Sequence, residues 1–224
     1  MQKYRTIVID PPWHYGTQWG NPTNRPNNRF TRYAMPYKTM SISEIQSLPL
    51  ALLADDNCEL FMWATHKYMP FAYPILAGWG FSYCETLTWC KKPRGTGQGG
   101  LFTPTTEFIL HGRKGKMPKK PRIDSTWWEV KRTNVHSKKP EFFQDMIETI
   151  TDEPRLEMFA RRARLGWHVW GNEVESDVEI PLRHLTPLAL DGAIAPDNQQ
   201  VLPADVLVGE GTLPEPPLAA KTHR

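Results

Sequence analysis

The sequence of 224 residues has little cysteine, and its few cysteines do not form the patterns of a secreted or zinc-binding domain. Cys58, Cys84 and Cys90 are an odd number and include no Cys-x-x-Cys pair. Such a set argues against a disulfide framework and against a zinc site, so no metal is expected. A reducing compartment fits this usage, and we expect a cytoplasmic protein.

Long apolar runs are also absent from the sequence. No window approaches the roughly 20 apolar residues of a membrane-spanning helix. The opening stretch MQKYRTIVIDPPW lacks the pattern of a secretory signal. We therefore expect no membrane association. Hydrophobic residues still make up 40% of the chain and aromatic residues 11%, which is enough for a globular core.

Neither sign of charge dominates the whole sequence, because 27 Lys and Arg face 24 Asp and Glu. The balance nevertheless changes along the chain. Residues 1–173 carry 24 basic against 16 acidic side chains, whereas residues 174–224 carry three against eight. A basic body favours a polyanionic partner, with nucleic acid as the leading candidate. A basic face that is simply solvated is the alternative.

Aromatic residues are absent after Glu175, where Pro, Ala, Asp and Leu dominate. This change in composition divides the chain into a folded domain, residues 1–174, and an acidic, Pro- and Ala-rich tail, residues 175–224. We expect the tail to be disordered or loosely attached.

Within the folded domain, β-rich runs alternate with helical patterns. Strands are predicted over residues 4–10, 58–65, 81–91, 105–115, 155–160 and 167–173. Helices are predicted over residues 41–54, where Ser41 and Glu44 have capping-box spacing, and over residues 66–80 and 139–150. Strands that alternate with helices favour an α/β sheet with ligands at the strand ends.

The tetrapeptide Asp10-Pro11-Pro12-Trp13 directly follows the first predicted strand. Its two prolines remove two backbone donors and fix φ, so the carbonyl groups of Asp10 and Pro11 can be held as acceptors. Trp13 offers a wide π face. A site that accepts hydrogen bonds from an amino group and stacks on a planar ring suits the 6-amino group of adenine. A proline turn with a core tryptophan behind it is the simpler structural alternative.

The 6-amino group of adenine is a weak nucleophile, because its lone pair is delocalised into the ring. Hydrogen bonds from the amine to the Asp10 carboxylate and the Pro11 carbonyl would favour a pyramidal nitrogen with an available lone pair. The electrophile must then be a strong methyl donor, and the sulfonium of S-adenosylmethionine qualifies. In-line placement should provide much of the rate. Asp10 would add electrostatic stabilisation and later help the proton to leave.

The sequence resembles the MT-A family of adenine-N6 methyltransferases, in order, from about Thr6 to Glu173. The stretches that carry the resemblance are DPPW (10–13), YKTMSISEI (37–45), LFMWAT (60–65), GWGFSYCETLTWCK (78–91), TEFILHGRKG (106–115), HSKKPEF (136–142), LEMFAR (156–161) and GWHVWGNE (166–173). The resemblance implies a Rossmann-like, S-adenosylmethionine-dependent methyltransferase fold with permuted motif order, in which the catalytic tetrapeptide precedes the cofactor-binding segments.

The resemblance also implies roles for individual residues. Asp10 and Pro11 would orient the target amine, while Pro12 and Trp13 would shape the adenine slot. Lys139 matches a lysine that contacts the methionine carboxylate of the cofactor, a role that suits a point positive charge. The cofactor-binding residues expected from the family are Asp10, Lys139, Glu157, Phe159, Arg161, Asn172 and Glu173.

Residues 14–40 match a family loop that closes over substrate and donor. Arginines interleave with aromatic residues in this loop, a composition that suits phosphate contact and base stacking. A solvated loop without that role is the alternative. The residues expected to bind substrate are Arg25, Arg29, Arg32, Tyr37, Lys38 and Glu107, the last matching a family glutamate near the site.

A second basic segment, residues 113–139, carries ten Lys or Arg together with Trp127 and Trp128. Two interpretations stay open for it. It is either a second wall of a nucleic-acid groove or an exposed loop with a buried Trp pair.

The leading functional hypothesis is formation of N6-methyladenine in DNA, on a base that is flipped out or single-stranded. The same reaction on RNA adenosine is the second hypothesis. A non-catalytic nucleic-acid-binding subunit is a third, against which the intact tetrapeptide argues. Cytosine or a glutamine amide as acceptor is disfavoured, because those enzymes typically have Ser or Asn before the prolines and Tyr after them. A homodimer and a complex with another subunit are both open.

Overall fold

A computed structural model of the chain describes residues 2–14, 38–92, 101–133 and 138–180. The chain divides into two units, residues 1–188 and 189–224, and the second lies wholly outside the described residues. Among the described residues, no helix is long and apolar enough to cross a membrane.

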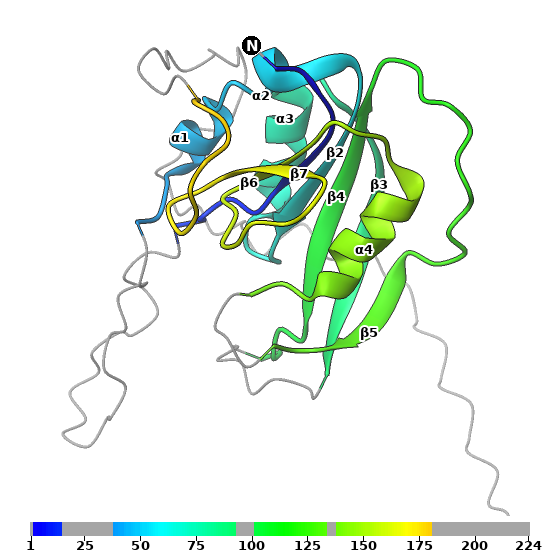
Figure 1. The fold of residues 1–224 in the computed structure, drawn as a ribbon. Helices are drawn as coiled ribbons and strands as arrows, with labels where there is room; N and C mark the ends of the chain where they lie inside the picture. Colours follow the sequence, from blue (N-terminus) through cyan, green and yellow to red (C-terminus); the bar gives the residue numbers. More distant parts are fainter. Residues whose placement is uncertain (1, 15–37, 93–100, 134–137, 181–224) are drawn as a thin grey trace, which may run out of the picture. The chain divides into compact units, whose positions relative to one another are not determined.

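The described residues contain one mixed sheet of seven strands (Figure 1). The strands are β1 (Tyr4–Ile9), β2 (Ala54–Ala64), β3 (Ser82–Lys92), β4 (Thr106–Lys114), β5 (Trp127–Lys131), β6 (Arg155–Met158) and β7 (Trp167–Trp170). Their order across the sheet is β5-β3-β4-β2-β1-β6-β7. β4 runs antiparallel to β2 and β3, and the other neighbouring pairs are parallel. The predicted α/β class is confirmed, and the parallel strands bring their carboxyl ends to one edge of the sheet.

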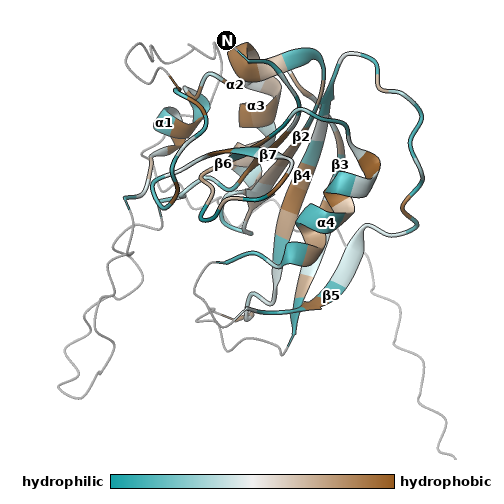
Figure 2. Cartoon of the chain, in the orientation of Figure 1, coloured by the Kyte–Doolittle hydropathy of each residue, from teal (hydrophilic) through white to brown (hydrophobic). Residues whose placement is uncertain are grey.

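Helices cover both faces of the sheet. The described helices are α1 (Ile42–Gln46), α2 (Leu50–Leu53), α3 (Met69–Gly78) and α4 (Glu141–Ile150). Successive residues of β1 point to opposite faces, so Ile7 and Ile9 pack into the core formed with α1, α2 and α3. Val8 packs instead with Phe143 and Ile147 of α4. α4 shows alternating apolar and polar bands in Figure 2, as expected for a helix with one buried face.

The predicted helix over residues 41–54 is wrong in its extent, because α1 and α2 are separate helices on either side of Pro49. Proline has no backbone N–H and restricts the residue before it, so a helix does not continue smoothly through this position. β2 begins at Ala54, ahead of its predicted start. The predicted capping box is present: Glu44 N donates to Ser41 Oγ at 3.2 Å, and Ser41 N donates to Glu44 Oε2 at 2.7 Å.

β5 lies inside the basic segment 113–139 and is an additional edge strand that the sequence does not predict. Its alternating side chains differ in environment, because Trp128 packs against Phe143 whereas Trp127 is 62% exposed. The interpretation as an exposed loop with a buried Trp pair is therefore wrong in two respects: Trp127 is exposed, and residues 127–131 form a strand and not a loop. The remaining predicted strands and helices are present with shifted ends.

The described part of the predicted tail, residues 175–180, packs against the sheet. Val169 N in β7 donates to Asp177 Oδ2 at 2.9 Å, and Asp177 N donates to Val169 O at 2.9 Å. Ile180 is 9% exposed and belongs to the core. The folded unit thus continues past the predicted boundary at residue 174, because this segment forms hydrogen bonds with backbone groups on the edge of β7 that β6 does not cover.

Candidate active site

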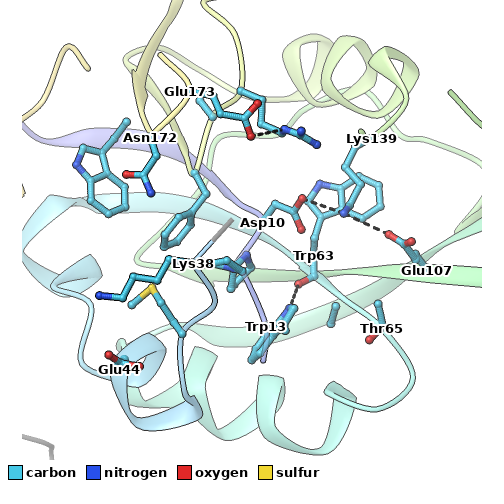
Figure 3. Close-up of a pocket in the computed structure, with 18 residues that line it drawn as sticks. Asp10, Trp13, Lys38, Glu44, Trp63, Thr65, Glu107, Lys139, Asn172 and Glu173 are labelled. Atoms are coloured by element: carbon cyan, nitrogen blue, oxygen red, sulfur yellow. Dashed lines mark hydrogen bonds and ion pairs between the residues drawn. The ribbon is translucent and has the colours of Figure 1, made fainter. Parts of the chain in front are cut away.

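The carboxyl ends of β1, β2, β6 and β7 meet at one edge of the sheet, where two adjoining cavities lie. Their volumes are about 590 and 300 Å³. Among the residues predicted for the site, those lining the larger cavity are Asp10, Pro11, Pro12, Trp13, Lys38, Glu107, Lys139, Phe159, Arg161, Asn172 and Glu173. Glu157 lines the second cavity, and Asp10 and Lys139 border both. Residues far apart in the sequence are therefore neighbours around one space (Figure 3).

Four residues predicted to bind substrate, Arg25, Arg29, Arg32 and Tyr37, lie outside the described residues. Lys38 is the first described residue after them and lines the larger cavity together with Glu44. The backbone N–H and the hydroxyl of Ser41 donate to the Glu44 carboxylate and hold its pKa below its usual range. Among the described residues, no group of three or more His, Cys, Asp or Glu side chains is placed to hold a metal ion.

The backbone of the tetrapeptide is fixed by hydrogen bonds on both sides. Trp13 N donates to the Pro11 carbonyl at 2.8 Å, and Met40 N donates to the Pro12 carbonyl at 2.8 Å. Asp10 is the first residue after β1, and its N–H donates to Met158 O in β6 at 3.5 Å. A carbonyl oxygen has two acceptor positions, and the donor seen on that of Pro11 among the described residues is Trp13 N, so a second position can serve a ligand.

Trp13 is buried at 4% exposure and does not present both faces of its ring. The ring stacks on Tyr68 with centroids 4.7 Å apart and an interplanar angle of 14°. Its indole N–H donates to Trp63 O at 3.2 Å. Tyr68 therefore covers one face of the Trp13 ring, and Trp13 is a fixed part of the cavity wall.

Asp10 lies within a row of charged side chains (Figure 3). Lys139 Nζ is 2.8 Å from Asp10 Oδ2 and 3.3 Å from Glu107 Oε2. It also lies over the ring of Trp63, 5.1 Å from the centroid. The other oxygen of Glu107, Oε1, is 2.5 Å from Lys91 Nζ. Positive and negative groups thus alternate along the row, and their formal charges cancel.

Burial and neighbouring charge act in opposite directions on these groups. The Asp10 side chain is 32% exposed and sits deep in the cavity, and burial raises the pKa of Asp10 more than Lys139 lowers it. Burial also acts to raise the pKa of Glu107, but Lys139 and Lys91 outweigh it and hold that pKa below its usual range. The pKa of Lys139 is raised, because Asp10 and Glu107 outweigh the opposing effect of burial. Asp10 is therefore held closer to protonation, and Glu107 further from it, than ordinary carboxyl groups.

The wall formed by β6 and β7 depends on two unusual backbone positions. Phe159, directly after β6, has a φ of +62°, in the left-handed region that residues with a Cβ seldom adopt. Such strain is concentrated at functional sites. Its ring packs edge-on against Trp170, with centroids 5.0 Å apart. Gly171 allows the two strand ends to approach, because a Cβ there would lie 2.2 Å from Ala160 O.

Polar groups of the same wall face the cavities from the ends of β6 and β7. Arg161 Nε donates to Glu173 Oε1 at 2.8 Å, and Asn172 lies beside this pair. In the second cavity, Gln144 Nε2 of α4 donates to Glu157 Oε2 at 2.8 Å. Burial raises the pKa of Glu157. The wall thus offers carboxylate, guanidinium and amide groups to a polar ligand.

Trp63, Thr65 and Lys91 belong to the site but are not among the residues predicted from the sequence. Trp63 and Thr65 line the larger cavity at the end of β2, the neighbour of β1. A strand end beside Asp10 was a usable signal for them. Lys91 reaches Glu107 because β3 and β4 pair in antiparallel register, with Trp89 opposite Glu107. No local pattern in the sequence indicates that contact.

Comparisons with known proteins agree with this arrangement. The MT-A70 family model matches residues 4–173, which include every predicted site residue. Type II methyltransferase M.MunI from a Mycoplasma species is 31% identical over 194 residues, covering 80% of this chain and 82% of that protein. The human N(6)-adenine-specific methyltransferase METTL4 is 28% identical over 194 residues, covering 76% of this chain and 37% of its own.

A fungal relative is similar over a comparable part of the chain. The N6-methyladenosine RNA methyltransferase MTA1 of Cryphonectria parasitica is 30% identical over 183 residues, covering 75% of this chain and 51% of its own. The chain therefore spans most of M.MunI but only about a third to a half of the human and fungal relatives. With the family model matched from β1 to the end of the β7 wall, the chain belongs to the MT-A70 family of methyltransferases.

Proposed function

We propose that this chain transfers a methyl group from S-adenosylmethionine to the 6-amino group of adenine in DNA. The observation that carries the proposal is the place of Asp10, which borders both cavities and is bonded to Lys139. The larger cavity is lined both by the tetrapeptide and by Phe159, Trp170 and Asn172, so a target base and a cofactor can meet beside the Asp10 carboxylate.

The residues around the cavities fit S-adenosylmethionine. The Lys139 ammonium suits the carboxylate of its methionine part. Glu173, at a strand end, suits the ribose hydroxyls in the way that acidic residues of nucleotide-binding folds do. Asn172 offers donor and acceptor groups to the adenine edge, and the rings of Phe159 and Trp170 offer it apolar surface. When bound, this cofactor supplies a methyl group on a positively charged sulfur.

The tetrapeptide is placed to hold and orient the target amine. The Asp10 carboxylate accepts one N–H of the amine, and the remaining acceptor position of the Pro11 carbonyl accepts the other. These two hydrogen bonds favour a pyramidal nitrogen with its lone pair available. Positioning of this kind provides much of the rate enhancement of a two-substrate reaction. The negative charge of Asp10 stabilises the positive charge that the nitrogen gains. The same carboxylate is the nearest base for the proton that the nitrogen then loses.

Support for DNA as substrate comes from the relatives. The type II designation of M.MunI, which matches along most of both chains, is used for methyltransferases that modify DNA. Adenine within a duplex is inaccessible, so the enzyme acts on a flipped-out or single-stranded base. RNA is the second candidate, because MTA1, named as an RNA methyltransferase, is similar over 75% of this chain.

The experiment that tests the proposal offers labelled S-adenosylmethionine to matched DNA and RNA oligonucleotides, each single- and double-stranded. Digested products are identified by mass, and Asp10→Asn, which keeps the shape of the side chain, is the control. We expect N6-methyldeoxyadenosine from DNA, and its loss in the variant. Methyladenosine from RNA alone would move the substrate to the second candidate. Nucleic-acid binding without transfer, on substrates of varied sequence, would refute the enzymatic proposal in favour of a binding subunit.

A further inference from the structure

Lys91 is a charged residue of β3 that is not among the described residues lining either cavity. Its side chain is only 18% exposed, and its Nζ is 2.5 Å from Glu107 Oε1. The same ammonium lies 5.3 Å from the centroid of the Trp89 ring. A largely buried lysine is costly unless it is paired, and among the described residues its carboxylate partner is Glu107.

Glu107 connects Lys91 to the reacting end of the site. Its Oε1 faces Lys91, while its Oε2 is 3.3 Å from Lys139 Nζ. Lys139 Nζ in turn is 2.8 Å from Asp10 Oδ2. Both carboxylate oxygens of Glu107 are therefore engaged by lysines, and one of them, Lys91, is not among the described residues that line the cavities.

The charged groups that face Asp10 come from four parts of the chain. Lys139 approaches from the segment before α4, Glu107 from β4, and Arg161 from the loop after β6. Glu157 of β6 also interacts with Asp10. Within the described part of the chain, Lys91 is linked to this set through its ion pair with Glu107.

We propose that Lys91 is a positioning residue of the methyl-transfer site: it holds Glu107 so that Lys139 stays between Glu107 and Asp10. The proposal rests on the function proposed above, because it concerns Asp10, whose carboxylate accepts a hydrogen bond from the target amine. Without Lys91, Lys139 is the one ammonium among the described residues that Glu107 and Asp10 share. Two carboxylates that share one cation do not both stay ionised as easily, and the proton goes to the one that is already closer to protonation. That carboxyl group is Asp10.

Lys92, the next residue of β3, provides a matched control. It is 68% exposed and pairs with Glu129 of β5, which is 51% exposed. Successive side chains of a strand point to opposite faces, so Lys92 faces away from Glu107. Lys91→Met and Lys92→Met each remove one positive charge from adjacent positions. Only Lys91→Met removes a charge from the row of ion pairs that leads through Glu107 and Lys139 to Asp10. Lys91→Arg restores the charge.

The first measurement is methyl transfer as a function of pH for the wild type and the three variants. We expect Lys91→Met to move the acid limb of kcat/KM upward by roughly half to one pH unit, a fraction of the effect of a direct ion pair. Lys92→Met should leave the limb unchanged, and Lys91→Arg should return it most of the way. An unchanged limb in Lys91→Met, or an equal shift in Lys92→Met, would overturn the proposal.

A second measurement does not depend on transfer. The carboxyl carbon of Asp10 is followed by NMR during a pH titration of protein labelled at aspartate, with Asp10→Asn to assign the signal. An upward shift of its midpoint in Lys91→Met but not in Lys92→Met supports the positioning role, even if the protein proves not to transfer methyl groups. A midpoint that does not move refutes the role, whatever the outcome of the transfer assay. Lys91→Gln repeats the measurement with a polar side chain if Lys91→Met does not fold.

Discussion

Substituting Phe159 by alanine and by glycine separates the contribution of its ring from that of its backbone. Both variants remove the ring that packs against Trp170, and they differ from each other only in the Cβ. At an ordinary position the glycine variant is less stable by roughly 0.5–1 kcal/mol, because glycine loses more conformational entropy on folding. Phe159, however, has a φ of +62°. A Cβ in the left-handed region costs roughly 1–2 kcal/mol, a cost that glycine avoids.

The two effects oppose one another, and the structure predicts which is larger. Setting a backbone cost of about 1–2 kcal/mol against an entropic cost of about 0.5–1 kcal/mol leaves Phe159→Gly more stable than Phe159→Ala by roughly 0.7 kcal/mol, the difference between the midpoints of the two ranges. In a folded unit of this size that difference corresponds to roughly 1.5–3 °C in Tm. Both variants should be less stable than the wild type, because the ring packs against the core.

Urea unfolding of the purified variants, followed by tryptophan fluorescence, measures this difference. Ala160→Gly is the control, since residue 160 is 1% exposed and is not among the described residues with positive φ. There glycine should be the less stable residue by roughly 1 kcal/mol. If Phe159→Gly is no more stable than Phe159→Ala, at equal m-values, the backbone at this position is not strained.

Three further results are expected. Gly171→Ala should destabilise the protein by roughly 2–3 kcal/mol and weaken S-adenosylmethionine binding in calorimetry, because its Cβ would lie 2.2 Å from Ala160 O. Gly78→Ala is the control and should be neutral or stabilising, because a Cβ there meets nothing within 4 Å. Equal losses of stability in the two variants would contradict the close approach of Gly171 to Ala160. The rate of transfer should fall as the pH drops through the raised pKa of Asp10, since only the anion accepts the N–H of the amine, so the acid limb of kcat/KM should lie above the ordinary aspartate value of about 3.9. Glu107→Gln should cost roughly 2–3 kcal/mol of unfolding free energy near pH 7. The pKa of Glu107 is lowered in the folded state, so its stabilisation is present above the unfolded value of about 4.3 and is lost as the pH falls through the folded value. The difference between Glu107→Gln and wild type in denaturant titrations should therefore shrink below about pH 4; a difference that is constant with pH would exclude an ionised Glu107 as the cause.

Local patterns in the sequence predict most of the sheet and the place of the tetrapeptide. The run over residues 4–10 is apolar and β-branched, and it forms β1 with Asp10 at its end. The capping box at Ser41 likewise depends only on residues close in the chain. The extent of the helix that follows is wrong because helical periodicity continues past Pro49, whereas the backbone does not.

Features that depend on pairing between distant strands are not predictable in the same way. β5 is short and lies in a polar, basic segment, and it is a strand because it pairs with β3. The burial of Trp13 depends on Tyr68, which α3 brings against it. Lys91 joins the site through the register of β3 and β4. In each case the two partners of the contact are far apart in the sequence, so local composition and spacing do not predict it.

The interior position of β1 in the sheet determines when, during synthesis, the site can form. β1 is made first, but it pairs on one side with β2 and on the other with β6. Thr6 of β1 donates to the carbonyl of Asp152, just before β6, and these residues are 146 positions apart. Contacts over such separations form late and slowly. A nascent chain therefore carries the tetrapeptide long before the wall that faces it, and the site can form only after residues 155–173 have also left the ribosome.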